Sequence, residues 1–251
     1  MASYQYALSD HDTESISYRD RDLASEVLGE LSFPETLYYT WTGDLPEPGE
    51  ERVLEAMLNT LMLHGVTPST LVSRLTLVSE PDAVQAAVAS AINGVGSRLI
   101  GTMKECSAAL HEVAAADDRD AAVKALVDEY AASGDRFPGI GHPHLEPIDP
   151  RAERLFELAD EAGVAGEHVE LLAAVRDAFE AEFDTTLPIN ATGAIAALSA
   201  DLGLPPTAAR GIAIVSRATG VVAELLAEEA EPIATDVWEH VDANAERPGG
   251  D

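Results

Sequence analysis

His142 lies in a loop made rigid by glycine and proline, within the stretch PGIGHPHLEPIDPRAERLF. Gly139 and Gly141 permit positive φ angles and let the backbone approach a ligand closely. The following DPRA predicts a helix start capped by Asp149, so Arg151 projects from a helix N-terminus, where anions are favoured. An imidazole beside such an arginine suits an anionic, carbonyl-bearing substrate. A rigid connector with a surface histidine is an equally good interpretation of these residues alone.

Two further basic side chains need an explanation. His64 ends a predicted helix over about 49–64, where an imidazolium meets the helix dipole favourably, so capping explains it without a ligand. Arg217 lies late in the apolar segment GIAIVSRATGVVAELL. Because arginine is rarely buried without a partner, Arg217 indicates either an interior ion pair or an anion site. Acidic surroundings predict surface positions for four further histidines, His11, His111, His168 and His240.

The chain has 251 residues, of which 45 are acidic and 15 basic, and its formal net charge is −30. Such a charge excludes general electrostatic attraction to nucleic acid or to anionic membranes. Apolar residues still recur regularly, so we interpret the chain as a folded, carboxylate-coated protein adapted to a salt-rich cytoplasm. No leader-like segment and no apolar run of roughly 18–20 residues is visible, and we expect a soluble cytoplasmic protein.

Cys106 is the single cysteine, which excludes an internal disulfide and a cysteine-based zinc site. The histidines and acids show no convincing metal spacing, and we expect no metal. Alanine and leucine dominate the apolar content, while aromatic residues make up only 5%, which favours packed helices.

Residues 1–20 are polar, and loose order is expected there. Helices are predicted at about 22–30, 34–42 and 49–64, and another begins at Thr67. Two more lie on either side of a glycine-rich break at 94–96, and one ends at Gly134. The remaining helices are predicted at 150–162, 165–183, 191–202, 206–217 and 218–229. No strand shows sustained alternation, so the predicted fold class is all-α.

Three stretches together resemble the citrate synthase superfamily. PGIGHPHLEPIDPRA is similar to its GxGHxxxxxxDPRA signature, and LPINATGAIAALSADLGLPPTAARGIAIVSRATG is similar to the later NVD and SRxxG segment. SFPETLYYTWTGDLP resembles the early SFEEVAYLLWxGxLP stretch. The likeness covers nearly the whole chain from about residue 20. The short length and LHGVTPSTLVSRLT with GVGSRLIGTMKECSAAL are most similar to the citryl-CoA lyase branch, and more distantly to the lyase module of ATP-citrate lyase.

This resemblance implies an all-helical homodimer. A small helical domain, 102–203, is inserted into a large domain formed by 20–101 and 204–251, and the active site lies between them. The implied chemistry is Claisen-type and uses an acyl-CoA, with an oxo acid or tricarboxylate as the other ligand. In the lyase direction, a base deprotonates the hydroxyl of citryl-CoA, the carbon–carbon bond breaks to give oxaloacetate and the acetyl-CoA enolate, and an acid protonates that enolate.

Four residues match the family's oxo-acid site. His64 matches the histidine that binds the oxaloacetate half, and His142 the histidine that acts as acid or base on its carbonyl or on the citryl hydroxyl. Arg151 and Arg217 match the arginines that hold the carboxylates. No third arginine is evident in the C-terminal EPIATDVWEHVD, where synthases usually supply one from the partner subunit.

The acetyl-CoA half is less complete. The turn of Gly139, Ile140 and Gly141 matches backbone that lies along coenzyme A. Ile100, however, stands where the family has an enolate-binding histidine, and Thr192 where it has the aspartate that moves the acetyl proton. Isoleucine has no donor and a threonine hydroxyl is a poor base near neutral pH, although Thr192 can still orient a water or bind the enolate oxygen. We therefore expect cleavage of citryl-CoA or a related 3-hydroxy-acyl-CoA rather than citrate synthesis.

Two other hypotheses stay open. A non-catalytic relative would bind coenzyme A or a carboxylate as a sensor or partner subunit, which the residues at positions 100 and 192 favour. A purely structural helical protein is the third, but it gives no reason for two histidines and two arginines at ligand positions.

Overall fold

A computed structural model describes residues 8–96, 101–142 and 147–245. It confirms the all-α fold class, with 68% helix and 4% strand. The elements are β1 (Ser9–His11), β2 (Ile16–Tyr18), β3 (Arg21–Asp22), the short π-helix η1 (Leu23–Val27), α1 (Phe33–Thr42), α2 (Pro48–Thr60), α3 (Pro68–Ser79), α4 (Val84–Val95), α5 (Thr102–Ala114), α6 (Arg119–Ser133), α7 (Pro150–Ala162), α8 (Glu167–Phe183), α9 (Ala191–Asp201), α10 (Pro206–Ala230) and α11 (Ala234–Ala243).

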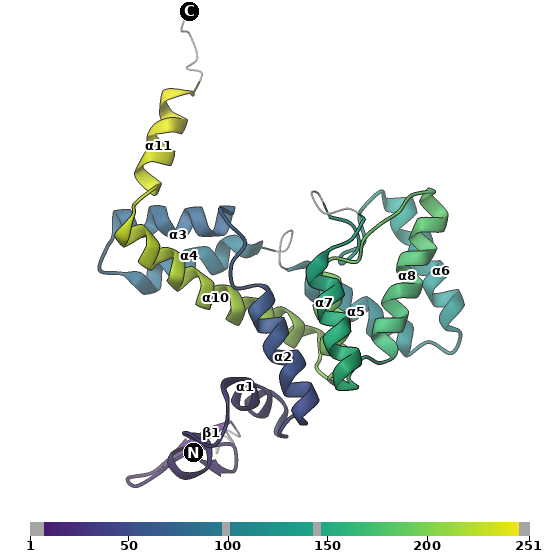
Figure 1. Ribbon diagram of the computed structural model, residues 1–251, viewed down its shortest axis with the longest axis horizontal. Coiled ribbons are helices and arrows are strands. Elements are labelled where there is room, and N and C mark those ends of the chain that lie inside the picture. Colours follow the sequence, from purple (N-terminus) through teal and green to yellow (C-terminus); the bar gives the residue numbers. More distant parts are fainter. Residues whose placement is uncertain (1–7, 97–100, 143–146, 246–251) are drawn as a thin grey trace, which may run out of the picture.

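Helix α10 connects two hydrophobic cores (Figure 1). Its first half contributes Ile212 and Ala213 to the larger core, which also contains residues of α1, α2 and α5 to α9. Its second half contributes Val221 and Leu225 to a smaller core with α3 and α4. Although α10 has 25 residues, neither it nor any other helix of the described segments is long and apolar enough to cross a bilayer. The division of the chain into an inserted small domain and a large domain stays a prediction.

The N-terminal segment differs from the expectation of loose order, which is wrong from residue 9 onward. Strands β1, β2 and β3 form an antiparallel sheet, in which Ser9 pairs with Tyr18. The side chain of Asp12 closes the first turn by accepting the N–H of Glu14 and of Ser15. Strands of two or three residues are too short to show an alternating pattern in the sequence. The hydrogen bonds accepted by Asp12 at the turn stabilise the sheet instead.

The expected break between helices at 206–217 and 218–229 is also wrong, because α10 runs unbroken from Pro206 to Ala230. Gly220 lies inside this helix, where an added Cβ would overlap the carbonyl oxygen of Met62. This glycine therefore serves a close approach between two segments of backbone rather than a helix end.

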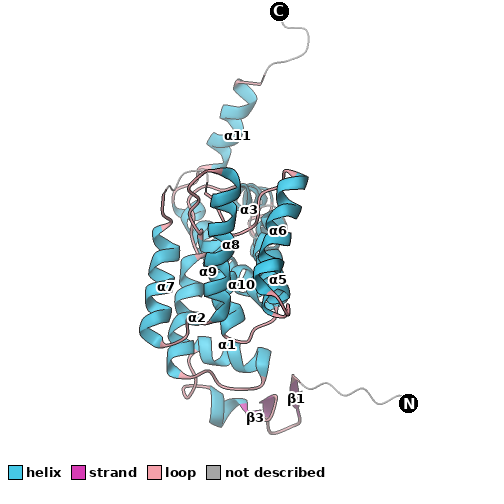
Figure 2. Ribbon diagram, turned by 90° about the vertical axis from the view of Figure 1, so that its right-hand side faces the viewer, coloured by secondary structure: helices cyan, strands magenta, loops and turns pink. Residues whose placement is uncertain are grey.

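Helix α11 was not expected, and its start is set by a side chain of α10. Glu228 accepts the backbone N–H of Ile233 at 3.1 Å and of Ala234 at 2.9 Å, which supplies partners for otherwise free helix N–H groups. Beyond this cap, α11 projects away from the rest of the molecule (Figure 2).

Glu228 also belongs to a buried ion pair. Its carboxylate accepts from Nη1 of Arg74 at 2.5 Å, and Glu224 pairs with the same guanidinium. The Glu228 and Arg74 side chains are only 3% and 8% exposed. Because burial removes both charges from water, either one left alone would be costly. The pair thus fixes α3 and the start of α11 against the end of α10.

Substitution of Glu228 tests this contribution. We expect Glu228→Ala to lower the free energy of unfolding by about 2–3 kcal/mol, because it removes one of the two carboxylates that pair with the buried Arg74 and uncaps α11. Arg74 keeps its pair with Glu224, which keeps the loss moderate. The matched control is Glu161→Ala, which removes an exposed pair with Arg52 and is expected to cost at most about 1 kcal/mol. Urea denaturation at one salt concentration measures both, and equal losses would contradict the assignment.

Candidate active site

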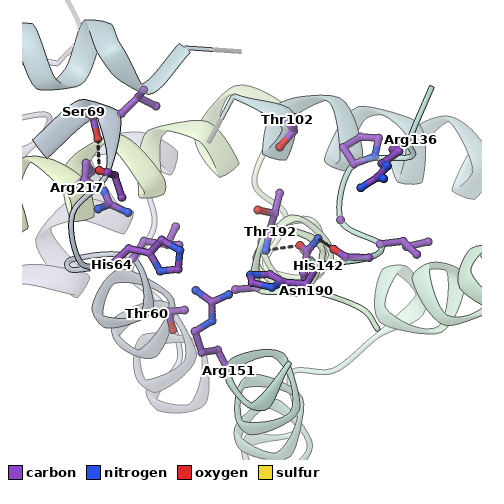
Figure 3. Close-up of a pocket in the computed structure, with 18 of the residues that line it drawn as sticks. Thr60, His64, Ser69, Thr102, Arg136, His142, Arg151, Asn190, Thr192 and Arg217 are labelled. Atoms are coloured by element: carbon purple, nitrogen blue, oxygen red, sulfur yellow. Dashed lines mark hydrogen bonds between the residues drawn. The ribbon is translucent and has the colours of Figure 1, made fainter. Parts of the chain in front are cut away.

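A cavity of about 460 Å³ opens between the two cores, a size typical of small-molecule sites (Figure 3). Segments 60–69, 136–142 and 190–192 supply most of its wall. All charged or titratable side chains among its described lining residues are basic, namely His64, Arg136, His142, Arg151 and Arg217. In a chain with three times as many acidic as basic residues, a cavity lined in this way favours an anionic ligand.

The guanidinium of Arg217 supplies the clearest signal in this cavity. The residue is 3% exposed, and its Nε and Nη1 atoms are buried without a hydrogen bond to the described residues. Burial lowers the pKa of Arg217, partly offset by Glu224, but an arginine stays protonated in proteins. A buried cation without a partner is unfavourable by several kcal/mol. Of the two interpretations of Arg217, the structure therefore favours an anion site over an interior ion pair.

Helix α10 positions Arg217 together with the segment that carries His64. The Ser216 hydroxyl donates to the carbonyl of Leu58, near the end of α2. One turn later, Gly220 lets the carbonyl of Met62 contact the helix. These two contacts dock the chain that follows α2 directly beside the Arg217 guanidinium.

His64 itself is not a helix cap, so that interpretation is wrong. Helix α2 ends at Thr60 instead of residue 64, and His64 lies in the following loop at the cavity wall. In Figure 3 its ring lies between the guanidinium groups of Arg151 and Arg217. Although the ring is open to the cavity, partial desolvation lowers the pKa of His64, and the charges of Arg151, Arg217 and His142 lower it further. A neutral imidazole at neutral pH both donates and accepts a hydrogen bond.

Asp149 holds Arg151 in place. Its carboxylate accepts from Nε of Arg151 at 3.0 Å and from Nη2 at 2.8 Å, while also capping α7 through the Arg151 N–H. Asp149 also accepts the N–H of Ala191, a residue distant in sequence at the start of α9. Burial alone would raise the pKa of Asp149, but the hydrogen bonds from Arg151 and Ala191 outweigh it and lower the pKa.

The glycine turn before His142 is fixed by Asn190. The Asn190 amide donates to the carbonyl of Gly141 at 2.7 Å, and the Asn190 N–H donates to the carbonyl of Gly139 at 3.0 Å. At Gly139, with φ of 97°, an added Cβ would lie 2.7 Å from Cα of Gly193. The role of Asn190 was not predicted from the sequence, although an asparagine before an apolar helix is a typical N-cap.

Asn190 also orients the start of α9. Its Oδ1 accepts the N–H of Thr192 at 2.9 Å and of Gly193 at 3.1 Å. Thr192 therefore lines the cavity at a helix N-terminus, beside the turn that ends at His142. Ile100 lies outside the described residues.

One cavity thus receives most of the residues singled out from the sequence. His64 and Arg217 come from the α2–α10 side, whereas His142, Arg151 and Thr192 come from the side of α7 and α9 (Figure 3). The turn of Gly139 to Gly141, including Ile140, also lines it. This arrangement can hold a carboxylate between two guanidinium groups while presenting imidazoles to a neighbouring oxygen.

His168 lies elsewhere, and its expected surface position is wrong. The residue is 8% exposed, and its Nδ1 lies 2.8 Å from Oδ1 of Asp201. Asp201 also accepts backbone N–H groups at the start of α8, which draws His168 inward despite its acidic neighbours. Across the described segments, no three His, Cys, Asp or Glu side chains gather in a way that could hold a metal.

The lowered pKa of His64 gives a pH-dependent prediction. In the wild type we expect a pKa below 6.5, so protonation begins only as the pH falls below that of an ordinary histidine. Arg217→Gln removes one repelling charge and should raise the pKa towards 6.5, whereas Arg154→Gln, at an exposed ion pair, should not change it. NMR titration of the ring, assigned with His64→Gln, measures this. A wild-type pKa of 6.5 or above would contradict it.

Comparisons with known proteins concern the family and the fold. The family "Citrate synthase, C-terminal domain" matches residues 2–235, while no curated protein matched. Citryl-CoA lyase from Hydrogenobacter thermophilus is 26% identical, with a TM-score of 0.88 over 99% of this chain and 95% of that one.

Two further structures share the fold. ATP citrate lyase from Methanothrix soehngenii, in complex with citrate and coenzyme A, is 16% identical, with a TM-score of 0.76 over 92% of this chain and 39% of that one. Citrate synthase from Thermoplasma acidophilum, in a ternary complex with carboxymethyl coenzyme A and oxaloacetate, is 20% identical, with a TM-score of 0.66 over 80% and 54%. The chain belongs to the citrate synthase family.

Proposed function

We propose that the chain is a citryl-CoA lyase-like enzyme, which cleaves citryl-CoA or a related 3-hydroxy-acyl-CoA to acetyl-CoA and an oxo acid such as oxaloacetate. The family supports a CoA-ester lyase or synthase type of enzyme, and the likeness to a citryl-CoA lyase over almost the whole of both chains favours cleavage. The observation that carries the proposal is the buried Arg217 guanidinium, whose unpaired charge requires an anion.

In this proposal the acyl half of the substrate lies at the end of the cavity lined by Arg217, Arg151 and His64. The two guanidinium groups bind its carboxylates, since Asp149 holds Arg151 with its planar group fixed. Neutral His64 donates a hydrogen bond to the oxygen that becomes the keto oxygen. These contacts strengthen as that oxygen develops charge.

Bond cleavage starts at the tertiary hydroxyl. His142 accepts its proton, the hydroxyl oxygen becomes the carbonyl of the oxo acid, and the bond to the thioester methylene breaks. The electron pair of that bond forms the enolate of acetyl-CoA, which takes one proton at carbon from a water molecule, and protonated His142 returns its proton to the resulting hydroxide. No other reactant is consumed, so atoms and charges balance.

In this proposal Thr192, which lines the cavity, lies beside the enolate oxygen. Its backbone is fixed by Asn190 at the N-terminus of α9, which favours negative charge nearby. We assign its hydroxyl to a hydrogen bond with the enolate oxygen or with the water that returns the proton. In this proposal the glycine turn 139–141, which lines the cavity, lies along the pantetheine arm.

An assay at molar salt, chosen because of the net charge of −30, tests the activity. Citryl-CoA should be converted to acetyl-CoA and oxaloacetate, which chromatography of quenched samples resolves. Arg217→Gln should lower kcat/KM about 100-fold or more, because the carboxylate loses its buried partner. Arg154→Gln is the control and should retain full activity. An intact protein without turnover would overturn the proposal.

The alternative function is a non-catalytic subunit or sensor that binds coenzyme A or a carboxylate. Thr192 favours it, because a threonine hydroxyl is not a competent base. This alternative predicts that oxaloacetate together with coenzyme A raises the Tm of the wild type but not the Tm of Arg217→Gln. It also predicts that the protein does not convert citryl-CoA.

We also propose that the chain works as a homodimer. Leu226 on α10 and Trp238 and Val241 on the projecting α11 are each more than 60% exposed, which supports burial against a second copy. Trp238→Asp should convert a dimer to a monomer in light scattering after size exclusion, without loss of helix content. Glu239→Gln, on the same helix, is the control. A wild-type monomer would contradict this part of the proposal.

A further inference from the structure

The hydroxyl-bearing side chain of Thr102 lines the same cavity as that of Thr192. Thr102 is the first residue of α5 and Thr192 is the second residue of α9, so the N-termini of two helices meet at this part of the wall. In Figure 3 the oxygen of Thr102 points toward Thr192, and both threonines lie apart from Arg217. Two hydroxyl groups from different helices therefore face one region of the cavity.

The starts of these two helices are held close together by the glycine turn. An added Cβ at Gly139 would lie 2.7 Å from Cα of Gly193, the residue after Thr192. The same Cβ would lie 2.9 Å from Sγ of Cys106, which is one turn after Thr102 in α5. The backbone of the turn thus packs directly against both helices. This packing fixes the positions of the two threonines before a ligand binds, which is what electrostatic stabilisation of a transition state requires.

The start of α5 favours a negatively charged oxygen nearby. Its N-cap is Gly101, which has no side chain to cap the helix, whereas Asp149 and Asn190 cap α7 and α9. Met103, the residue after Thr102, is fully buried, so this end of the helix is largely removed from water. The positive end of a helix dipole acts more strongly where water is excluded. Among the described lining residues, no carboxylate opposes a negative charge here.

We propose that Thr102 is a further catalytic residue, whose hydroxyl donates a hydrogen bond to the thioester oxygen of the acyl-CoA. This inference rests on the proposed function. When the carbon–carbon bond breaks, the thioester becomes an enolate and its oxygen gains negative charge. The hydrogen bond from Thr102 strengthens at that moment, and Thr192 faces the same oxygen from the other helix. Thr102 transfers no proton, so the proton balance of the cleavage is unchanged.

Binding of an enolate mimic tests Thr102 without turnover. Carboxymethyl coenzyme A carries a carboxylate close to where the enolate oxygen would lie, whereas coenzyme A ends at its thiol. Each is titrated calorimetrically, with saturating oxaloacetate, into the wild type, Thr102→Val and Thr102→Ser. We expect Thr102→Val to weaken binding of carboxymethyl coenzyme A about tenfold or more and to leave binding of coenzyme A unchanged. Thr102→Ser keeps the donor and should bind both ligands as the wild type does.

Thr207→Val is the matched control. Thr207 also lies in the first turn of a helix, α10, but it is exposed and is not among the residues that line the cavity. This variant should bind both ligands and cleave citryl-CoA as the wild type does.

Cleavage of citryl-CoA gives the matching kinetic test. Thr102→Val should lower kcat roughly 10- to 100-fold with little change in KM, because the lost hydrogen bond is strongest in the transition state. Thr102→Ser should recover most of this loss. A variant that merely disturbed the fold would weaken binding of coenzyme A as well.

The outcomes separate this inference from the proposed function. If Thr102→Val matches the wild type in kcat and in binding of carboxymethyl coenzyme A, the inference is overturned and the proposed function stands. The same holds if Thr102→Val weakens binding of coenzyme A as much as that of the mimic. If the wild type neither binds the mimic nor cleaves citryl-CoA, both are overturned.

Discussion

The candidate site depends on one buried carboxylate, that of Asp149. Its oxygens accept the guanidinium and backbone N–H of Arg151 and the N–H of Ala191, so it joins the starts of α7 and α9. These hydrogen bonds keep the group ionised despite its burial. Asn190, the residue before Ala191, holds the glycine turn that leads to His142. The Asp149 carboxylate therefore aligns the wall that carries His142 with Arg151.

Features set by neighbouring residues were predictable from the sequence. DPRA correctly placed Asp149 at the N-cap of α7, Thr67 caps α3, and Gly134 ends α6 in the left-handed conformation. Each of these depends on backbone groups within one turn. The bond from Asp149 to Ala191 spans 42 residues and leaves no local trace. The grouping of His64, His142, Arg151 and Arg217 was expected from the family resemblance, since periodicity alone cannot bring distant helices together.

The errors share a physical cause, which is a partner distant in sequence. A break between residues 217 and 218 was expected close to Gly220, because the neighbour of this glycine, Met62, could not be foreseen. His64 was placed in α2 for a related reason, since the end of that helix is fixed by Ser216. The acidic residues around His168 predicted a solvated position, yet Asp201 at the end of α9 draws it inside. In each instance a tertiary contact overrode a sound local preference.

One turn and a half of α10 contains three residues with different roles. Ser216 holds the end of α2, Arg217 faces the cavity, and Gly220 leaves room for the Met62 carbonyl. A lineage that altered this turn would disturb an anchor, a charge and a backbone contact at once. On the opposite wall Asn190 fixes the backbone, but the side chains of Arg136 and Thr192 line the cavity and can change without disturbing those backbone contacts. We therefore expect related proteins that act on other substrates to differ on that wall and to keep the SRATG turn unchanged.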